Sequence, residues 1–425
     1  MKILLLSIGT RGDMEPFLAV GEMLAEKGHE VVFAFPAQFA ELVPDNYPFH
    51  ALSPKFIELV ESEEGKLIMG KASLWTKFRA LLYLYREGMK VNQEMAQQQY
   101  QIVAQETPDL IIHHAKCNYP PLWGMQQEGH RTVLLSPVLY LIHPVEGHPH
   151  VGFNRNLGAF LNRLTYRIAN FGLVKTIYDV QKHLPTTTTF SRATIKKAVK
   201  AQKLVFTVSE SLFKRPAEWP KNVQVLGYHE RNKQLDWQPD TSLTEFLGRH
   251  QKVLFLTFGS MINADPEATS RMLFEVLDKL GIATIINTAA GGLLRLEEFA
   301  QKDTFYFTAR IPYDWILDKV YAIAHHGGSG TTHAGLKYAC PTLIIPHIID
   351  QFGWNHLIAE IGAGPKGIGI NKLKAHQFEQ LILDLMNNPK YKQAVDQITT
   401  QMSNERLEDQ LYQFLTDVEP VNHTT

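Results

Sequence analysis

The first thirty-five residues of this chain alternate in a way that is typical of parallel α/β folds. An apolar run at residues 2–8 leads into a turn with Gly9 and Gly12, an amphipathic stretch at about 16–27 and a second apolar run at 30–35. Short apolar runs bounded by glycine indicate buried strands, and apolar residues recurring every three or four positions indicate a helix. A strand, a helix and another strand within this length predict a βαβ unit with parallel strands.

The same pattern recurs and divides the chain into two domains. Apolar runs at 109–113, 132–136 and 204–209 extend the first sheet. After a polar stretch around residues 228–242 the pattern restarts at 253–257, with a helix predicted at 266–280. Further strands are expected at residues 283–287, 305–307, 320–325 and 342–345. We therefore expect two Rossmann-like, doubly wound domains at 1–230 and 246–395, a linker at 231–245, and a last helix at 396–425 that packs across either domain.

Composition excludes several functional classes. The 425 residues suffice for two to three domains of about 150 residues each. A formal net charge of -1 gives no electrostatic footprint for nucleic acid or for an anionic membrane. The two cysteines, Cys117 and Cys340, are too few for a disulfide framework, which favours a cytoplasmic location. Neither an export signal nor a membrane-spanning segment is expected.

Two stretches between the N-terminal strands are predicted to be helical and rich in apolar residues. They cover residues 74–91 and 155–183. The second places on one face Leu157, Phe160, Leu161, Leu164 and Ile168, and it carries Arg155, Arg163, Arg167 and Lys175. Amphipathic helices usually face the core, so we expect both stripes to be buried or to line an apolar acceptor pocket. Contact of the second helix with a membrane surface is the alternative, and it is not expected.

Residues 325–333 read HHGGSGTTH between an apolar strand and a helix, and they predict a diphosphate-binding loop. Three glycines allow close approach of the backbone, and the helix N-terminus offers free N–H groups. His326 is expected to donate a hydrogen bond to a phosphate oxygen, with Ser329, Thr331 and Thr332 adding hydroxyls or amides. Neither the dinucleotide fingerprint nor a Walker loop is present, which disfavours hydride transfer and NTP hydrolysis. The alternative is a plain strand-to-helix turn with Thr331 or Thr332 as N-cap.

A second polar loop follows the apolar run at 342–345. It carries Asp350 and Gln351, which lie at the same edge of the predicted sheet as the diphosphate loop. A carboxylate beside a carboxamide offers acceptors and donors to adjacent sugar hydroxyls. The alternative is that Asp350 only caps a helix that begins near Phe352.

These motifs resemble those of the inverting, UDP-glycosyltransferase-like enzymes of family 1, which have the GT-B fold. They are most similar to the bacterial branch of sterol and antibiotic glycosyltransferases. The resemblance rests on IGTRGDMEPF at 8–17, FGS at 258–260, HHGGSGTTHAG at 325–335 and PHIIDQ at 346–351, in matching order along nearly the whole chain. It implies two Rossmann-like domains facing a central cleft, with the acceptor on the N-terminal domain and the nucleotide sugar on the C-terminal domain. It also implies a last helix that crosses back, and no metal ion or cofactor.

The resemblance implies a role for each matching residue. The diphosphate is held by His326 and the amides around Gly328, Ser329, Gly330 and Thr331, and is approached by Gly259 and Ser260. Asp350 and Gln351 hold sugar hydroxyls, and the backbone at Arg310 and Ile311 meets the base edge. Plant-type members have a tryptophan where this chain has Arg310, and a ribose-binding glutamate where it has Ala334. The choice between UDP and dTDP therefore stays open.

Asp13 is the candidate general base. It follows the first strand, at the sheet edge where such folds place ligands. The antibiotic and sterol branches have aspartate there, whereas plant-type members have histidine. A carboxylate with an ordinary pKa is a weak base for an alcohol, so either proton transfer is concerted with bond formation or the apolar cleft raises the pKa. Capping the following helix is the alternative role. Thr10, Arg11 and Gly12 are expected to reach the diphosphate, with Arg11 as the only charged donor there.

Three functions are weighed on these motifs. The leading one is transfer of a hexose, expected to be glucose, from a nucleoside-diphosphate sugar to a hydroxyl of an apolar acceptor such as a sterol, a phenolic or flavonoid, or a polyketide; UDP is favoured over dTDP. The alternatives are a nucleotide-sugar epimerase of the same fold and a non-catalytic relative that only binds ligand. The expected partners are the nucleotide-sugar donor and the apolar acceptor. A metal site at His143, His148 and His150 is a weaker alternative to an acceptor-side loop.

Overall fold

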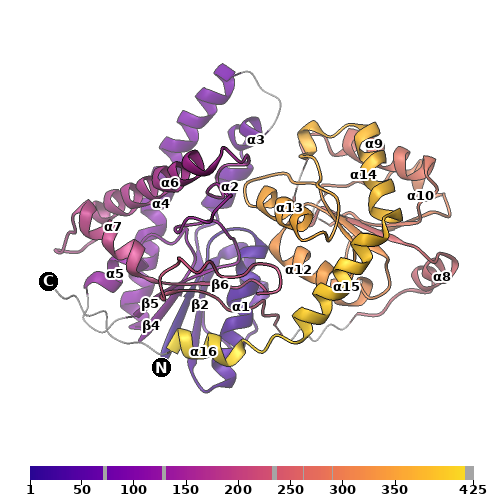
Figure 1. The fold of residues 1–425 in the computed structure, drawn as a ribbon. Coiled ribbons are helices and arrows are strands. Elements are labelled where there is room, and N and C mark those ends of the chain that lie inside the picture. The colour runs from indigo at the N-terminus through magenta and orange to yellow at the C-terminus, as the bar shows by residue number, and fades with distance from the viewer. Residues whose placement is uncertain (70–73, 127–130, 232–236, 262, 290, 417–425) are drawn as a thin grey trace. The chain divides into compact units, whose positions relative to one another are not determined.

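A computed structural model of the chain describes residues 1–69, 74–126, 131–231, 237–261, 263–289 and 291–416 (Figure 1). The chain divides into two compact units. The first comprises Met1–Asn232 and the segment from Arg406 onward, and the second comprises Lys233–Glu405. Residues 232–236 of the expected linker and residues 417–425 of the expected last helix lie outside the described residues.

The first unit contains a seven-stranded sheet in the order β3-β2-β1-β4-β5-β6-β7, and every pair in it is parallel. Its strands are β1 (Lys2–Leu6), β2 (Glu30–Pro36), β3 (Phe49–Leu52), β4 (Leu110–His113), β5 (Arg131–Ser136), β6 (Lys203–Phe206) and β7 (Val223–Val225). The central strands are buried on both faces, which explains their continuous apolar runs. Two short strands, β3 and β7, were not predicted.

The helices of the first unit lie between these strands. They are α1 (Arg11–Glu26), α2 (Lys55–Glu61), α3 (Glu63–Met69), α4 (Leu74–Glu106), α5 (Pro120–Gln126), α6 (Ala159–Val180), α7 (Arg192–Ala201) and α16 (Glu408–Thr416), with short 3-10 turns η1 (Ala37–Leu42) and η2 (Gln181–His183). Helix α1 begins five residues earlier than predicted, because Pro16 was taken as its first residue and lies inside it. Asp13 is therefore within the first turn of α1.

The last helix of the chain belongs to the first unit. Leu411 and Leu415 of α16 are fully buried, and they share an apolar core with Leu18 of α1 and Phe33 of β2. The sequence suggested one continuous helical stretch at the C-terminus. Instead α15 (Pro389–Ser403) ends in the second unit, and α16 begins after the division at Glu405.

The second unit contains a five-stranded parallel sheet in the order β10-β9-β8-β11-β12. Its strands are β8 (Leu254–Thr257), β9 (Thr284–Asn287), β10 (Phe305–Thr308), β11 (Ala322–His325) and β12 (Thr342–Ile344). All five were predicted. Its helices are α8 (Thr241–Arg249), α9 (Pro266–Lys279), α10 (Glu297–Ala300), α11 (Tyr313–Ile316), α12 (Ser329–Lys337), α13 (Gln351–Glu360), α14 (Ala375–Asn387) and α15, with the 3-10 turn η3 (Ile370–Lys372).

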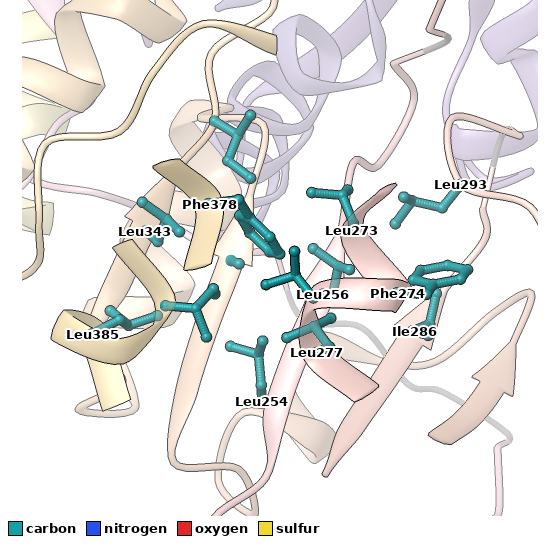
Figure 2. Packing of buried hydrophobic residues seen from close by; sticks show 14 of the residues in the cluster. Leu254, Leu256, Leu273, Phe274, Leu277, Ile286, Leu293, Leu343, Phe378 and Leu385 are labelled. Atoms are coloured by element: carbon teal, nitrogen blue, oxygen red, sulfur yellow. The ribbon is translucent and has the colours of Figure 1, made fainter. Parts of the chain in front are cut away.

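One face of this second sheet packs against α9 and α14 (Figure 2). Leu254 and Leu256 of β8 lie between Phe274 of α9 and Phe378 of α14, and all four side chains are almost completely buried. Asp265 caps the start of α9 by accepting a hydrogen bond from the Ala268 N–H at 2.9 Å. This packing fixes the strands whose ends carry the loops described below.

The apolar stripe predicted on α6 is not buried, contrary to our expectation. Phe160, Leu161 and Ile168 are 78%, 45% and 54% exposed. The buried face of α6 instead carries Asn162, Thr165, Tyr166, Val174, Ile177 and Val180. None of the helices in the described ranges combines the length and the apolar character that crossing a bilayer requires.

Candidate active site

Each sheet has one place where the strand order reverses. In the first unit β1 lies between β2 and β4, and in the second β8 lies between β9 and β11. Ligands of open parallel sheets bind outside the carboxyl ends of the strands at such a reversal. The loops after β1 and β4, and those after β8 and β11, are therefore the places to examine. Asp13 follows β1, and His326 follows β11.

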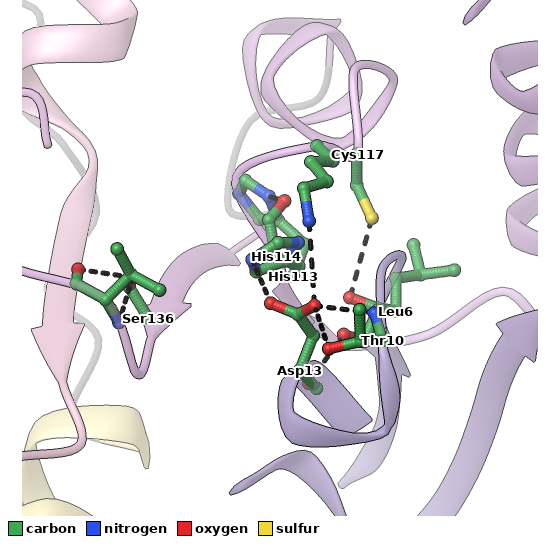
Figure 3. A network of polar contacts seen from close by, with 10 residues as sticks. Leu6, Thr10, Asp13, His113, His114, Cys117 and Ser136 are labelled. Carbon is green, nitrogen blue, oxygen red and sulfur yellow. Dashed lines mark hydrogen bonds and ion pairs between the residues drawn. The ribbon is translucent and has the colours of Figure 1, made fainter. Parts of the chain in front are cut away.

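Asp13 lies in the first unit at the start of α1, with Thr10 as N-cap (Figure 3). Its Oδ2 accepts hydrogen bonds from the Thr10 N–H at 2.7 Å and from the Thr10 hydroxyl at 3.2 Å. Thr10 is thus the N-cap, and Asp13 is the third residue of the helix, whose carboxylate accepts from the N-cap N–H as in a capping box. The alternative with Asp13 as N-cap is therefore wrong. The capping contacts occupy Oδ2, whereas Oδ1 faces a residue of the loop after β4.

That residue is His114, which follows β4 and was not identified from the sequence. Its Nε2 lies 3.5 Å from Oδ1 of Asp13, and the ammonium of Lys116 lies 3.6 Å from Oδ2. The two come from the opposite side of the strand reversal, since β4 pairs with β1. A His-X-Lys sequence directly after a predicted strand was the available signal. Its significance depends on β4 being the neighbour of β1.

The electrostatics of this site hold Asp13 in the charged form. Burial raises the pKa of Asp13, but Lys116, His114 and the hydrogen bonds from Thr10 outweigh it, so the pKa lies below its ordinary value. Burial and the nearby Lys116 ammonium lower the pKa of His114 to about 4, so its ring is neutral at pH 7. A raised pKa for Asp13, one of the two routes considered from the sequence, is therefore wrong.

Gly9 allows the Asp13 carboxylate to take this position. Its φ is +144°, and a Cβ placed on it would lie 2.1 Å from Oδ2 of Asp13 and 2.8 Å from the Lys116 ammonium. Only a residue without a side chain fits between these groups. The glycine after β1 thus has a steric role at the candidate base.

We expect Gly9→Ala to lower the free energy of unfolding by about 2–4 kcal/mol, because it strains the backbone and displaces the mostly buried, hydrogen-bonded carboxylate of Asp13. Thermal and denaturant unfolding measure this. Gly12→Ala is the matched control, because Gly12 lies in the same turn and the nearest atom to its Cβ would be 3.7 Å away. Equal stability of the two variants would contradict the steric role of Gly9.

The remaining residues of this loop are more exposed. Thr10, Arg11 and Gly12 are exposed, and the Arg11 guanidinium pairs with Glu15 at 3.0 Å. From the sequence we expected Arg11 to be the only charged donor at this loop. This is wrong, because Lys116 also lies there.

In the second unit, His326 lies at the strand reversal between two glycines. A Cβ on Gly259, after β8, would lie 3.0 Å from its ring, and a Cβ on Gly328 would lie 2.6 Å from its Nε2. The ring is 8% exposed, and its Nδ1 has no hydrogen-bond partner among the described residues. Burial and the neighbouring His347 lower the pKa of His326 to about 3, so at pH 7 it offers one neutral N–H donor.

The helix behind His326 presents an uncapped N-terminus. Its N-cap is Gly328, and no described side chain makes a capping hydrogen bond there. The hydroxyl of Thr332 is turned inward and donates to the Gly328 carbonyl at 2.9 Å. The alternative with Thr331 or Thr332 as N-cap is therefore wrong. The N–H groups at Ser329, Gly330 and Thr331 start the helix in the manner of anion sites.

Asp350 and Gln351 follow β12 at the same sheet edge. Asp350 precedes α13, and its side chain makes no capping hydrogen bond. Gln351 is 4% exposed, and its Oε1 accepts from the His347 and Ile348 N–H groups at 2.7 and 3.0 Å. Gln351 thus holds the loop instead of pointing to solvent. The neighbouring Ile349 has a φ of +30°, which is strained for a branched residue.

The residues expected to meet the base lie after β10. The N–H and carbonyl of Arg310 both contact the Thr308 hydroxyl, at 3.3 and 3.1 Å, and the Ile311 side chain is buried in the core. Ala334 packs in the same core, so its side chain is not available to a ribose. Ser260 is exposed beside Gly259.

The histidines considered from the sequence as a weak metal site, at 143–150, pack against aromatic rings. The His148 ring stacks on Tyr140 with centroids 4.6 Å apart, and the His150 ring lies against Tyr166. In the part of the chain that the structure describes, no group of three His, Cys, Asp or Glu side chains is arranged to hold a metal ion.

A cavity of about 190 Å³ lies in the first unit and is lined in part by α6. It is lined mainly by apolar side chains, together with His113, His150, Asn170 and Gln202. His113 ends β4, and the next residue, His114, contacts Asp13. The Nε2 of His113 is buried without a hydrogen-bond partner among the described residues. The cavity can therefore take an apolar molecule that carries a hydroxyl donor.

Comparison with known proteins agrees with both units. Residues 3–113 match the glycosyltransferase family 28 N-terminal domain, and residues 297–414 match the C-terminal domain of erythromycin biosynthesis protein CIII-like proteins. The chain is 27% identical over 426 residues to the sterol 3-beta-glucosyltransferase UGT80A2 of Arabidopsis thaliana, covering 95% of this chain and 63% of that protein. The chain thus spans less than two thirds of this curated relative.

Solved structures share the fold. The glycosyltransferase of kitacinnamycin superposes with a TM-score of 0.68 at 14% identity, covering 97% of this chain and 99% of that one. The glycosyltransferase VinC, solved in complex with dTDP, gives a TM-score of 0.63 at 16% identity over 97% and 98% of the two chains. Residues 3–113 thus resemble the N-terminal domain of glycosyltransferase family 28, residues 297–414 resemble the erythromycin CIII-like C-terminal domain, and the chain shares the GT-B fold of the solved glycosyltransferases.

Proposed function

We propose that this protein transfers glucose from a nucleoside-diphosphate sugar to the hydroxyl of an apolar acceptor, with inversion at the anomeric carbon. The observation that carries the proposal is the pairing of two sites at strand reversals. One holds the carboxylate of Asp13, whose side chain is 13% exposed, and the other holds an uncapped helix N-terminus beside His326. A base and an anion site are the two elements that such a transfer requires.

The donor diphosphate is assigned to the second unit. We assign the N–H groups of Ser329, Gly330 and Thr331 and the ring N–H of His326 as donors to phosphate oxygens, with Gly259 allowing close approach. Asp350 is proposed to accept hydrogen bonds from sugar hydroxyls, and Gln351 to hold its loop. Glucose is the favoured sugar because the relative is named a glucosyltransferase, and UDP is the nucleotide that we favour from the sequence. Because VinC was solved in complex with dTDP, dTDP-sugars are tested as well.

The acceptor is assigned to the first unit. The relative's name points to a sterol, and the apolar lining of the cavity that α6 helps to form supports an apolar acceptor. A whole sterol exceeds about 190 Å³, so the cavity would take only part of it. Phenols and flavonoids are the smaller alternatives.

The chemistry follows from the charged state of Asp13. The acceptor oxygen attacks the anomeric carbon while the bond to the diphosphate breaks on the opposite face, and the hydroxyl proton passes to Asp13. Because the pKa of Asp13 is lowered, proton transfer has to accompany bond formation and cannot precede it. The His114 ring lies 3.5 Å from Oδ1, and because it is neutral at pH 7 it adds no charge there.

Mass spectrometry of reaction products tests the proposal. UDP- and dTDP-glucose are incubated with sterols, flavonoids and simple phenols, and a glucosylated acceptor is the expected product. Formation of an epimer from the donor alone would indicate the epimerase instead. Nucleotide binding without any product would indicate a non-catalytic relative.

Lys116→Met should move the acidic limb of the pH profile of kcat/KM to higher pH. Burial raises the pKa of Asp13 and Lys116 opposes it, so removing the ammonium lets burial prevail. The depressed pKa stabilises the folded protein above the ordinary pKa of 3.8, and this contribution disappears as the pH falls. Lys55→Met is the control, because Lys55 pairs with Glu94 at 2.6 Å. An unmoved limb would contradict the assignment of the base.

A further inference from the structure

An apolar face on α6 and the segment before it is exposed to solvent. Phe160, Leu164, Ile168 and Phe171 follow each other at spacings of four, four and three residues, so they share one side of the helix. The exposed fractions are 78% for Phe160, 39% for Leu164, 54% for Ile168 and 65% for Phe171, with Phe153, Leu157 and Leu161 also exposed. Soluble proteins rarely expose so many large apolar side chains together without a partner.

The first half of α4 extends this face. Trp75, Leu81 and Tyr85 are 69%, 57% and 55% exposed. The two helices are neighbours, since the Lys175 ammonium on α6 donates to the Tyr85 hydroxyl on α4 at 3.0 Å. We call the exposed side chains of these two segments the docking face, namely Trp75, Leu81, Leu82, Tyr83, Tyr85, Phe153, Leu157, Phe160, Leu161, Leu164, Ile168 and Phe171.

Within the two segments that carry the docking face, the charged residues have one sign. Residues 65–86 and 147–178 contain no aspartate or glutamate, although the whole chain has a net charge of -1. Exposed arginines lie among the apolar residues, namely Arg79, Arg86, Arg155, Arg163 and Arg167. The cationic character is therefore local to these two segments.

We propose that the docking face binds the surface of an anionic phospholipid bilayer, with α6 lying in the plane of the interface. Helices of this kind insert aromatic and aliphatic side chains at the boundary of head groups and acyl chains, while arginines meet the lipid phosphates. This inference does not depend on the proposed glucosyl transfer. From the sequence, membrane contact of this helix was the possible alternative that we did not expect.

Two other occupants fit the face less well. A second copy of the chain would place like-charged arginines opposite one another across a two-fold axis, which is unfavourable. A small acceptor would cover only part of a face that extends over two helices. A bilayer meets both the apolar residues and the arginines.

Co-sedimentation with vesicles tests the proposal. Vesicles of phosphatidylcholine with about 30 mol % phosphatidylglycerol should bind the protein, and pure phosphatidylcholine vesicles should bind it at least about tenfold more weakly. Phe160→Ser combined with Phe171→Ser should reduce the partition coefficient about tenfold or more, and so should Arg163→Gln combined with Arg167→Gln. All four side chains are exposed, so folding should be retained and is checked by thermal unfolding.

Matched controls use exposed residues elsewhere. Leu383→Ser removes an apolar side chain that is 40% exposed on α14, and Lys196→Gln with Lys197→Gln neutralises two exposed lysines on α7. Both should leave vesicle binding unchanged. The proposal is overturned if the wild-type protein stays in the supernatant or binds both vesicle types equally. It is also overturned if the Phe and Arg variants bind like the controls, or if light scattering shows a dimer that the Phe variant dissociates.

Discussion

Asp13→Asn is expected to lower kcat by about a hundredfold or more while leaving the affinity for the donor nucleotide nearly unchanged. The amide keeps the size of the side chain and can still face Thr10 and His114, but it cannot take up the acceptor proton. Single-turnover kinetics with glucosylated acceptor as the readout measure the loss, and calorimetry with UDP measures the affinity.

Asp45→Asn is the matched control, because Asp45 is an exposed aspartate of the same unit. It should behave like the wild-type protein. Unaltered turnover in Asp13→Asn would remove Asp13 from the role of base and leave it only its capping contacts with Thr10. A large fall in UDP affinity would show instead that the carboxylate acts on donor binding.

His326→Ala should weaken UDP binding by about ten- to a hundredfold. The change removes a hydrogen-bond donor to a charged phosphate, an interaction worth about 1.5–3 kcal/mol. It also leaves space between Gly259 and Gly328, which the ring now separates. Titration calorimetry with UDP and with dTDP measures the effect.

His376→Ala is the control for this prediction, because His376 is an exposed histidine of the second unit. It should bind UDP as the wild-type protein does. The uncapped N–H groups of α12 remain in His326→Ala, so residual binding is expected. Wild-type affinity in His326→Ala would mean that the diphosphate does not contact this ring.

The sequence was sufficient for the fold class and for most of the strands. Buried parallel strands appear as continuous apolar runs, and every strand of the second unit was predicted in this way. The strands β3 and β7 were missed because FHAL and VQV are short and mix polar with apolar residues. The start of α1 was predicted too late, at Pro16, because proline is favoured in the first turn of a helix. In the structure Pro16 lies further inside α1.

The candidate residues could be predicted as members of loops, but their contacts could not. His114 and Lys116 approach Asp13 only because β4 pairs with β1, and strand order is not written in local sequence. The lowered pKa of Asp13 follows from that pairing. The turned-in carboxamide of Gln351 likewise depends on the path of the loop at His347 and Ile348.

The orientation of α6 shows a different limit. Its apolar pattern was recognised, but we expected the apolar stripe to face the core, as is usual, and in the structure it faces solvent. The helix packs through Asn162, Thr165 and Tyr166, and Asn162 accepts from the Leu157 N–H while Thr165 accepts from the His150 N–H. These local hydrogen bonds satisfy a polar packing face, which leaves the apolar one to solvent.

A crystal structure of the protein soaked with UDP tests the central claim most directly. We predict the diphosphate within hydrogen-bond distance of the N–H groups of Ser329, Gly330 and Thr331, with a phosphate oxygen facing the ring of His326. Nucleotide bound at any other place, with the N-terminus of α12 occupied only by solvent, would contradict the assignment of the donor site and with it the proposed reaction.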